Sequence, residues 1–181
     1  MLSTATFPET EIREAIRDIP DYPKPGILFK DITTVLRDAA LFQAILDEMQ
    51  RRAVELRPDY VVGIEARGFI FGAPLAERLN AGFIPARKKG KLPGETISYS
   101  YVLEYGEDCI EIHQGAIEPG KRVLVVDDLL ATGGTAEACV KLLQQANIEV
   151  VGLLFMIELA FLKGRERFTK GLSVESLVDF L

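Results

Sequence analysis

Hydrophobic and polar positions repeat along the chain with two periods, one typical of helices and one typical of strands. Apolar residues recur every three or four positions in four segments, which predicts helices at residues 11–19, 39–56, 67–80 and 135–147. Apolar or extended runs predict strands at residues 27–33, 60–64, 82–87, 122–127 and 148–157. Because strands and helices alternate along the chain, we expect an α/β fold with a mostly parallel central sheet flanked by helices.

Two further segments alternate strictly between apolar and polar residues. They cover residues 96–106 and 108–117 and meet at a Gly-Glu-Asp turn. This pattern predicts a β hairpin that forms a flap or hood over about residues 88–115. No repeat or linker interrupts the chain, so we expect a single domain over residues 1–181, with a separate N-terminal segment over about residues 1–35.

Composition narrows the possible functions. The chain has 181 residues and a net charge of -6, which argues against nonspecific nucleic-acid binding but allows a local basic site. We expect no membrane partner and a cytoplasmic location, because the sequence shows neither a signal peptide nor a bilayer-spanning apolar stretch. Cys109, Cys139 and His113 lack the spacing of metal ligands, and buried structural cysteines are expected.

The strand predicted at residues 122–127 ends in two adjacent acids and a glycine-rich loop. Ligands of α/β sheets bind beyond the carboxyl ends of the strands, so this loop is the first candidate site. Gly133 and Gly134 allow a ligand to approach the backbone, and the next helix begins with N–H groups that favour an anion. Thr132 and Thr135 add hydroxyl donors, and no lysine of a P-loop or glycine pattern of a dinucleotide site is present. The loop is typical of a phosphate site.

Asp127 and Asp128 need an explanation of their own. Two neighbouring carboxylates at a buried strand end repel each other and need a cation or hydrogen-bond donors. A metal ion is one answer, and the vicinal hydroxyls of a ribose are another. Acids that suit a sugar, next to a loop that suits a phosphate, together indicate a ribose 5-phosphate.

At this point the sequence resembles a known family. The stretch VLVVDDLLATGGT resembles the phosphoribosyl-pyrophosphate (PRPP) motif of type I phosphoribosyltransferases. The segments DYPKPGILFKDIT, GIEARGFIFGAPLAERL, ARKKGKLPGETISYSYVLEYG and ELAFLKGRERF resemble the adenine-specific members of that family. The resemblance implies the type I fold, a homodimer, and an Mg2+-dependent transfer of the 5-phosphoribosyl group from PRPP to adenine, with AMP and pyrophosphate as products.

The resemblance also implies roles for individual residues. Ribose hydroxyls would be bound by the acid pair, and the 5-phosphate by Ala131, Thr132, Gly133, Gly134 and Thr135. Pyrophosphate would be bound by Arg67, Arg87, Lys88 and Lys91, with Lys89 as a further candidate, and the metal mainly by PRPP rather than by the protein. Adenine would be bound by Leu28, Phe29, Lys30 and Leu159, and the groups at the reacting centre would be Glu104, Tyr105 and Arg67. The family also tends to have a cis peptide at the position of Glu65–Ala66.

Two alternatives remain open at this stage. One is a PRPP-dependent transferase for another purine base, which would share the acidic motif but generally lack the PGILFKD and LEYG segments. The other is a regulator that binds PRPP without turnover. Such regulators add a DNA-binding domain, and the expected N-terminal segment EIREAIRDIPDYPKPG leaves no room for one.

Overall fold

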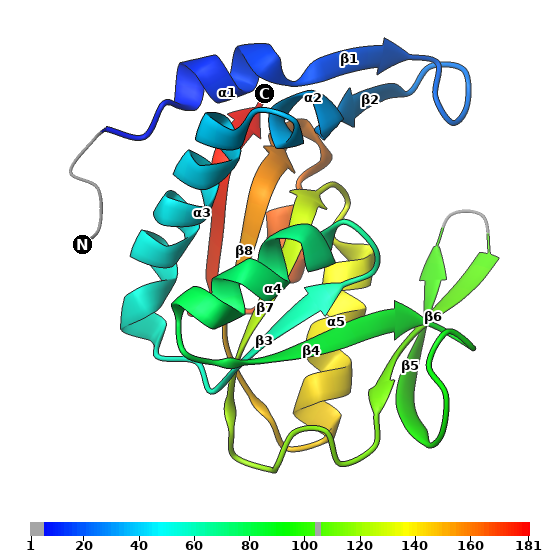
Figure 1. Ribbon diagram of the computed structural model, residues 1–181. Helices are drawn as coiled ribbons and strands as arrows, with labels where there is room; N and C mark the ends of the chain where they lie inside the picture. The colour runs from blue at the N-terminus through cyan, green and yellow to red at the C-terminus, as the bar shows by residue number, and fades with distance from the viewer. Residues whose placement is uncertain (1–5, 104–105) are drawn as a thin grey trace. The chain divides into compact units, whose positions relative to one another are not determined.

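The computed structural model describes residues 6–103 and 106–181, which divide into two compact units (Figure 1). The first unit ends at Glu48 and the second is Met49–Leu181. The predicted α/β class is confirmed in the second unit, which contains the sheet. The single domain expected over residues 1–181 stays a prediction. Among the described residues, none of the helices combines the length and apolar character that crossing a membrane requires.

The first unit contains a small two-stranded sheet. Its elements are α1 (Glu9–Ala15), β1 (Arg17–Pro20), β2 (Leu28–Asp31), α2 (Thr33–Leu36) and the start of α3 (Ala39–Ala53). The helix predicted over residues 11–19 is wrong in its second half, where the chain forms β1. Strand pairing explains the difference, because β1 runs antiparallel to β2 and Arg17 forms an ion pair with Asp31. The backbone N–H of Thr33 and, to a smaller extent, the Arg17 guanidinium group lower the pKa of Asp31 to about 2.

The second unit is built on a seven-stranded sheet in the order β5-β6-β4-β3-β7-β8-β9. Strands β4, β3, β7, β8 and β9 are parallel, and the hairpin β5–β6 joins β4 antiparallel at one edge. In chain order its elements after α3 are η1 (Val54–Leu56), β3 (Tyr60–Ile64), α4 (Gly68–Arg78), β4 (Gly82–Lys88), β5 (Thr96–Leu103), β6 (Gly106–His113), β7 (Arg122–Leu130), α5 (Gly134–Gln145), β8 (Glu149–Leu159), η2 (Ala160–Leu162), η3 (Gly164–Arg167) and β9 (Ser173–Phe180).

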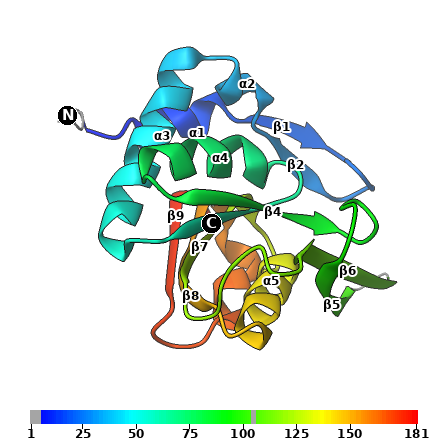
Figure 2. The same cartoon turned by 60° about the horizontal axis from the view of Figure 1, so that its bottom comes forward.

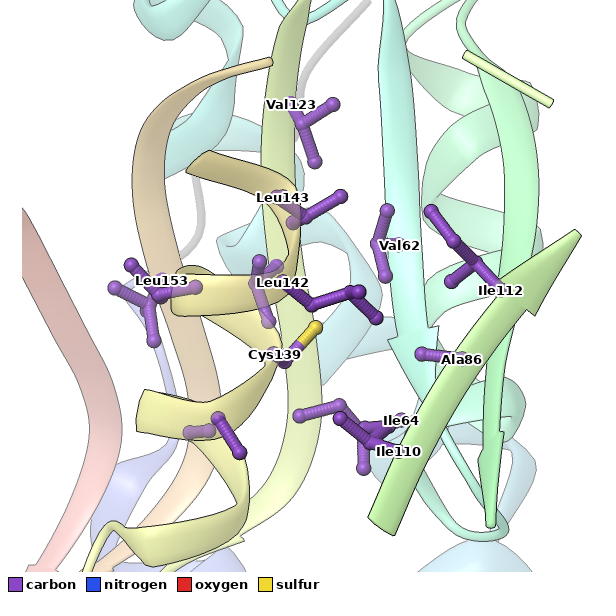
Figure 3. Close-up of a cluster of buried hydrophobic side chains, with 14 of the residues drawn as sticks. Val62, Ile64, Ala86, Ile110, Ile112, Val123, Cys139, Leu142, Leu143 and Leu153 are labelled. Atoms are coloured by element: carbon purple, nitrogen blue, oxygen red, sulfur yellow. The ribbon is translucent and has the colours of Figure 1, made fainter. Parts of the chain in front are cut away.

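Helices α4 and α5 cover opposite faces of this sheet (Figures 1 and 2). Side chains of a strand alternate between the two faces, and β3 follows this rule. Val62 and Ile64 lie in the buried cluster that contains Cys139 and Leu142 of α5 (Figure 3). The position between them, Gly63, lies against the other helix, because a methyl group there would come within 3.2 Å of the Gly68 carbonyl oxygen. Both cysteines are buried, as predicted, and neither forms a disulfide.

The core between the sheet and α5 supports a prediction about stability. Leu142 is 2% exposed in this cluster. Replacing it with alanine leaves a cavity, so L142A is expected to lower the free energy of unfolding by about 2–5 kcal/mol. L162A is the matched control, because Leu162 is 39% exposed and its truncation should cost less than about 1 kcal/mol. Urea unfolding followed by circular dichroism measures both, and equal losses would contradict this description of the core.

Candidate active site

The glycine-rich loop lies at the carboxyl end of β7, where the sequence predicts it. Ala131–Thr135 leads from β7 into α5, and Gly133 adopts a left-handed conformation with φ 79° at the start of the helix. A pocket at this end is lined by Asp127, residues 129–135 and Ala136. The structure therefore brings the predicted phosphate loop and one of the two acids into a single pocket.

The acid pair is strongly desolvated. The backbone N–H of Asp128 donates to Asp127 Oδ1 at 2.8 Å. Burial is the main cause that raises the pKa of both carboxyl groups, and the charge of Asp128 raises the pKa of Asp127 further. Arg67 Nε lies 2.9 Å from the buried Asp128 Oδ2 and lowers its pKa in part, yet no described donor is aligned for a hydrogen bond to that oxygen. Asp128 Oδ2 thus retains unused acceptor capacity.

The turn after β3 carries Arg67 to this pair. Strands β3 and β7 are parallel neighbours, so their carboxyl ends lie at the same edge of the sheet. The peptide bond Glu65–Ala66 is cis, as the resemblance predicts. A methyl group on Gly68 would come within 2.7 Å of the Val126 carbonyl oxygen, so only glycine lets α4 begin this close to β7.

Arg87 has partners that the sequence did not predict. Its guanidinium group donates to Glu65 Oε1 at 2.7 Å and to the Lys91 carbonyl oxygen at 2.8 Å. The hydrogen bond from Arg87 lowers the pKa of Glu65, and that carboxylate also accepts from the backbone N–H of Lys88. In this structure Arg87 therefore fixes the shape of the loop that follows β4. This role is separate from any direct binding of an anion by Arg87.

A buried carboxylate, Glu111, holds the same loop from the other side. It is 5% exposed and accepts hydrogen bonds from the backbone N–H groups of Gly90 at 3.0 Å and Leu92 at 3.3 Å, and from Thr96 Oγ1 at 3.3 Å. Sequence reasoning missed Glu111. Its only signal is a charged residue between the core residues Ile110 and Ile112, which alternation alone assigns to solvent.

The hairpin reaches the phosphate loop through a chain of polar side chains. Lys88 Nζ lies 2.9 Å from Asp108 Oδ2, Tyr101 donates to Asp108 Oδ2 at 3.3 Å, and the same hydroxyl lies 3.1 Å from Thr135 Oγ1. Burial opposes ionisation of Asp108, but Lys88 and the backbone N–H of Cys109 outweigh it and lower its pKa. Burial also raises the pKa of Tyr101. Tyr101 and Asp108 are site contacts that the sequence analysis did not identify, since no motif marks them.

The residues predicted to bind the base lie in both units. In the first unit Leu28 is 49% exposed, and the ring of Phe29 packs edge-on against Tyr22 with centroids 5.2 Å apart. The side chain of Lys30 pairs with Asp18 at 2.6 Å. Leu159 is half-buried at the end of β8 in the second unit. Glu104 and Tyr105 lie outside the described residues.

The described residues contain no group of three or more His, Cys, Asp or Glu side chains that would hold a metal ion. Asp127 and Asp128 offer oxygen donors only, which suit Mg2+. Mg2+ commonly keeps several waters and binds through one or two carboxylates together with substrate phosphates. The residues present therefore fit a metal that arrives with a phosphorylated substrate, and they do not form a complete cage.

Comparisons with known proteins agree with this site. The model of the phosphoribosyl transferase domain matches residues 33–170. The chain is 56% identical to the adenine phosphoribosyltransferase of Acidobacterium capsulatum over 169 residues, which cover 93% of each chain. The crystal structure of adenine phosphoribosyltransferase from Thermoanaerobacter pseudethanolicus has a TM-score of 0.89 and 53% identity, covering 94% of this chain and 99% of that one.

A similar structure contains ligands. Adenine phosphoribosyltransferase from Saccharomyces cerevisiae, complexed with D-2,5-dideoxy-2,5-imino-altritol 1,6-bisphosphate and adenine, has a TM-score of 0.88 and 41% identity. The two structures match over 94% of this chain and 98% of the yeast chain. The family match extends over most of the chain, and the relatives agree on one activity. The chain therefore belongs to the phosphoribosyl transferase domain family and, within it, to the adenine phosphoribosyltransferases.

Proposed function

We propose that this chain transfers the 5-phosphoribosyl group from PRPP to adenine, giving AMP and pyrophosphate, and that it acts in purine salvage. The observation that carries the proposal is the acid pair at the end of β7, followed directly by a loop with N–H groups and hydroxyls around one pocket. Relatives that cover almost the whole chain share this activity in their names, and the structure of the yeast relative contains adenine.

In this proposal the acid pair and the loop bind the two polar ends of the ribose 5-phosphate. Two desolvated carboxylates, one of which has an oxygen without a hydrogen-bond partner, gain stability when two hydroxyls donate to them. The backbone of Ala131–Thr135 and the start of α5 would receive the 5-phosphate, where the helix dipole favours an anion. Fixing both ends orients C1 of the ribose for attack by the base, which is catalysis by positioning.

Positive charge near the leaving group would assist its departure. Arg67 lies at the acid pair, and Lys88 ends strand β4, directly before the loop that Glu111 and Arg87 hold in shape. We assign Arg67, Lys88 and Lys91 to direct binding of the pyrophosphate. Arg87 contributes to pyrophosphate binding by direct contact or by fixing the shape of the loop. When bound, Mg2+ would neutralise charge on the pyrophosphate and so stabilise its departure. The chain's own carboxylates Asp127 and Asp128 would hold the sugar, with the metal carried mainly by PRPP.

The base would be read by the segment Leu28–Lys30. The Lys30 side chain already pairs with Asp18, so we assign the reading of the base to the backbone of this strand and to the ring of Phe29. Leu159, Glu104 and Tyr105 complete the proposed base site on the resemblance alone. The homodimer also rests on the resemblance, and sedimentation of the purified chain tests it. The cytoplasmic location is proposed from the sequence pattern.

The proposed reaction is tested with a panel of bases. The purified chain is incubated with PRPP, Mg2+ and either adenine, hypoxanthine, guanine, xanthine or orotate, and nucleotides are separated by chromatography. We expect AMP from adenine and less than about one hundredth of that rate from the other bases, because a site built for one set of hydrogen bonds rejects a base that leaves them unpaired. Preferred turnover of another base would overturn the assignment of the base, and PRPP binding without any turnover would favour the regulator.

The raised pKa of Asp127 leads to a prediction with a defined sign. Folding raises the pKa of Asp127, so ionisation of this acid destabilises the folded state. The loss of stability begins at the unfolded pKa of about 4 and grows as the pH rises above it. D127N is therefore expected to melt at a higher temperature than the unmodified chain at neutral pH, with a difference that shrinks as the pH falls to about 4. Its kcat/KM for PRPP should fall by about tenfold to a hundredfold, because hydrogen bonds to a charged carboxylate are replaced by weaker ones to a neutral amide oxygen.

D59N serves as the control with the opposite sign. The backbone N–H of Arg122 and the ammonium group of Lys121 lower the pKa of Asp59, so its ionised form stabilises the fold above its unfolded pKa. D59N should melt at a lower temperature at neutral pH and approach the unmodified chain in acid, with unchanged kcat/KM. Melting curves recorded between about pH 4 and 8 measure both variants. A D127N variant that melts below the unmodified chain at neutral pH would show that the carboxylate is compensated in the folded state.

A further inference from the structure

The short helix η3, Gly164–Arg167, lies against the outside of the phosphate loop. A methyl group on Gly133 would come within 2.7 Å of the Gly164 carbonyl oxygen, and one on Gly164 would overlap the carbonyl oxygen of Ala131. The two backbones therefore touch directly, and only glycine fits at both contact points. The position of η3 and the shape of the loop are thus coupled.

Arg167 adds two hydrogen bonds to this contact. Its Nε donates to the Thr132 carbonyl oxygen at 2.6 Å, and its Nη1 donates to Glu137 Oε2 at 3.0 Å. Glu137 is in the first turn of α5, and its backbone N–H donates to the Gly133 carbonyl oxygen at 2.8 Å. One guanidinium group therefore holds both the loop and the helix that follows it.

The hydrogen bond to Thr132 determines the direction of a neighbouring donor. In a trans peptide the C=O group and the following N–H group point in opposite directions. Because the Thr132 carbonyl points at Arg167, the N–H of Gly133 points away from it. Thr132 and Gly133 both line the pocket at the end of β7. The arginine on the outside of the loop thereby fixes the orientation of a donor in the loop.

A polar network fixes η3 itself. Arg165 Nε lies 3.1 Å and 3.2 Å from the two carboxylate oxygens of the buried Glu158, and its Nη2 donates to Ser176 Oγ at 2.9 Å. Ser176 also donates to Glu158 Oε2 at 2.9 Å. Glu158 is on β8 and Ser176 is on β9, so η3 is anchored to two strands of the sheet.

We propose that Arg167 is a positioning residue for the 5-phosphate: held by η3, it orients the peptide between Thr132 and Gly133 so that the Gly133 N–H group faces the phosphate. This inference rests on the proposed function and adds to it a residue that does not itself touch the substrate. The guanidinium plane is needed, because the two acceptors lie on different elements and a fork of fixed donors reaches both.

The test compares R167K with R122K. Arg122, the first residue of β7, is the matched control because its guanidinium group also binds one carbonyl oxygen and one glutamate. It donates to the Leu56 carbonyl oxygen at 2.8 Å and to Glu149 Oε1 at 2.7 Å. We expect R167K to raise the KM for PRPP about tenfold, the factor for one ordinary hydrogen bond, while kcat and the KM for adenine change by less than about threefold. R122K should leave all three constants unchanged. A general loss of structure would not produce this selective change in one KM.

Binding of ribose 5-phosphate separates this inference from the proposed function. Calorimetry with ribose 5-phosphate needs no turnover, and we expect about tenfold weaker binding to R167K than to R122K. If the unmodified chain makes AMP and the two variants behave alike, the inference is overturned and the proposed function stands. If no base is converted, the proposed function fails, and the ribose 5-phosphate affinities alone decide the inference.

A second variant covers the case in which R167K does not fold. E137Q removes the charged partner of Arg167 and keeps its bond to Thr132. A smaller rise in the KM for PRPP, about threefold, supports the positioning role. An unchanged KM for PRPP in folded E137Q and unchanged ribose 5-phosphate binding overturn it.

Discussion

The desolvation of two adjacent carboxylates at the end of the strand β7, one buried and one partly exposed, is the constraint on which the rest of the site depends. Desolvation raises the pKa of both groups, and the charge of Arg67, which forms an ion pair with Asp128, offsets this rise only in part. The start of α4 must come close to the end of β7, where a side chain would collide with it, and Gly68 makes this approach possible. A site of this kind is costly without a ligand, and polyhydroxylated, phosphorylated ligands supply the donors and the charge that it lacks.

Much of this site could be predicted from the sequence because its main signals are local. The apolar run before Asp127 indicates a buried strand, and the glycine pair with two threonines indicates a turn into a helix that suits a phosphate. These features lie within about a dozen consecutive residues, so periodicity and turn chemistry are enough to place them. The choice of adenine required the resemblance, since no physical rule applied to Leu28–Lys30 selects one base.

The parts that could not be predicted depend on partners far apart in the sequence. Arg87 could bind an anion or a carboxylate, and only the pairing of β3 with β4 brings Glu65 to it. Residues 17–19 continue a helical pattern, but pairing with β2 outweighs that weak preference. Strand β9 was not predicted at all, and it includes Ser176, which is buried because Glu158 and Arg165 satisfy its hydroxyl.

The contact between Tyr101 and Thr135 has a consequence for how the hairpin responds to substrate. The Tyr101 hydroxyl has a single proton, which it donates to Asp108, so in its contact with Thr135 it accepts the Thr135 proton. A phosphate that accepts the same proton from Thr135 competes with Tyr101 and weakens the hold of the loop on the hairpin. By thermodynamic reciprocity, any change that strengthens this contact lowers the affinity for that phosphate by the same factor. The hold on the hairpin therefore depends on what occupies a loop more than thirty residues away in the sequence.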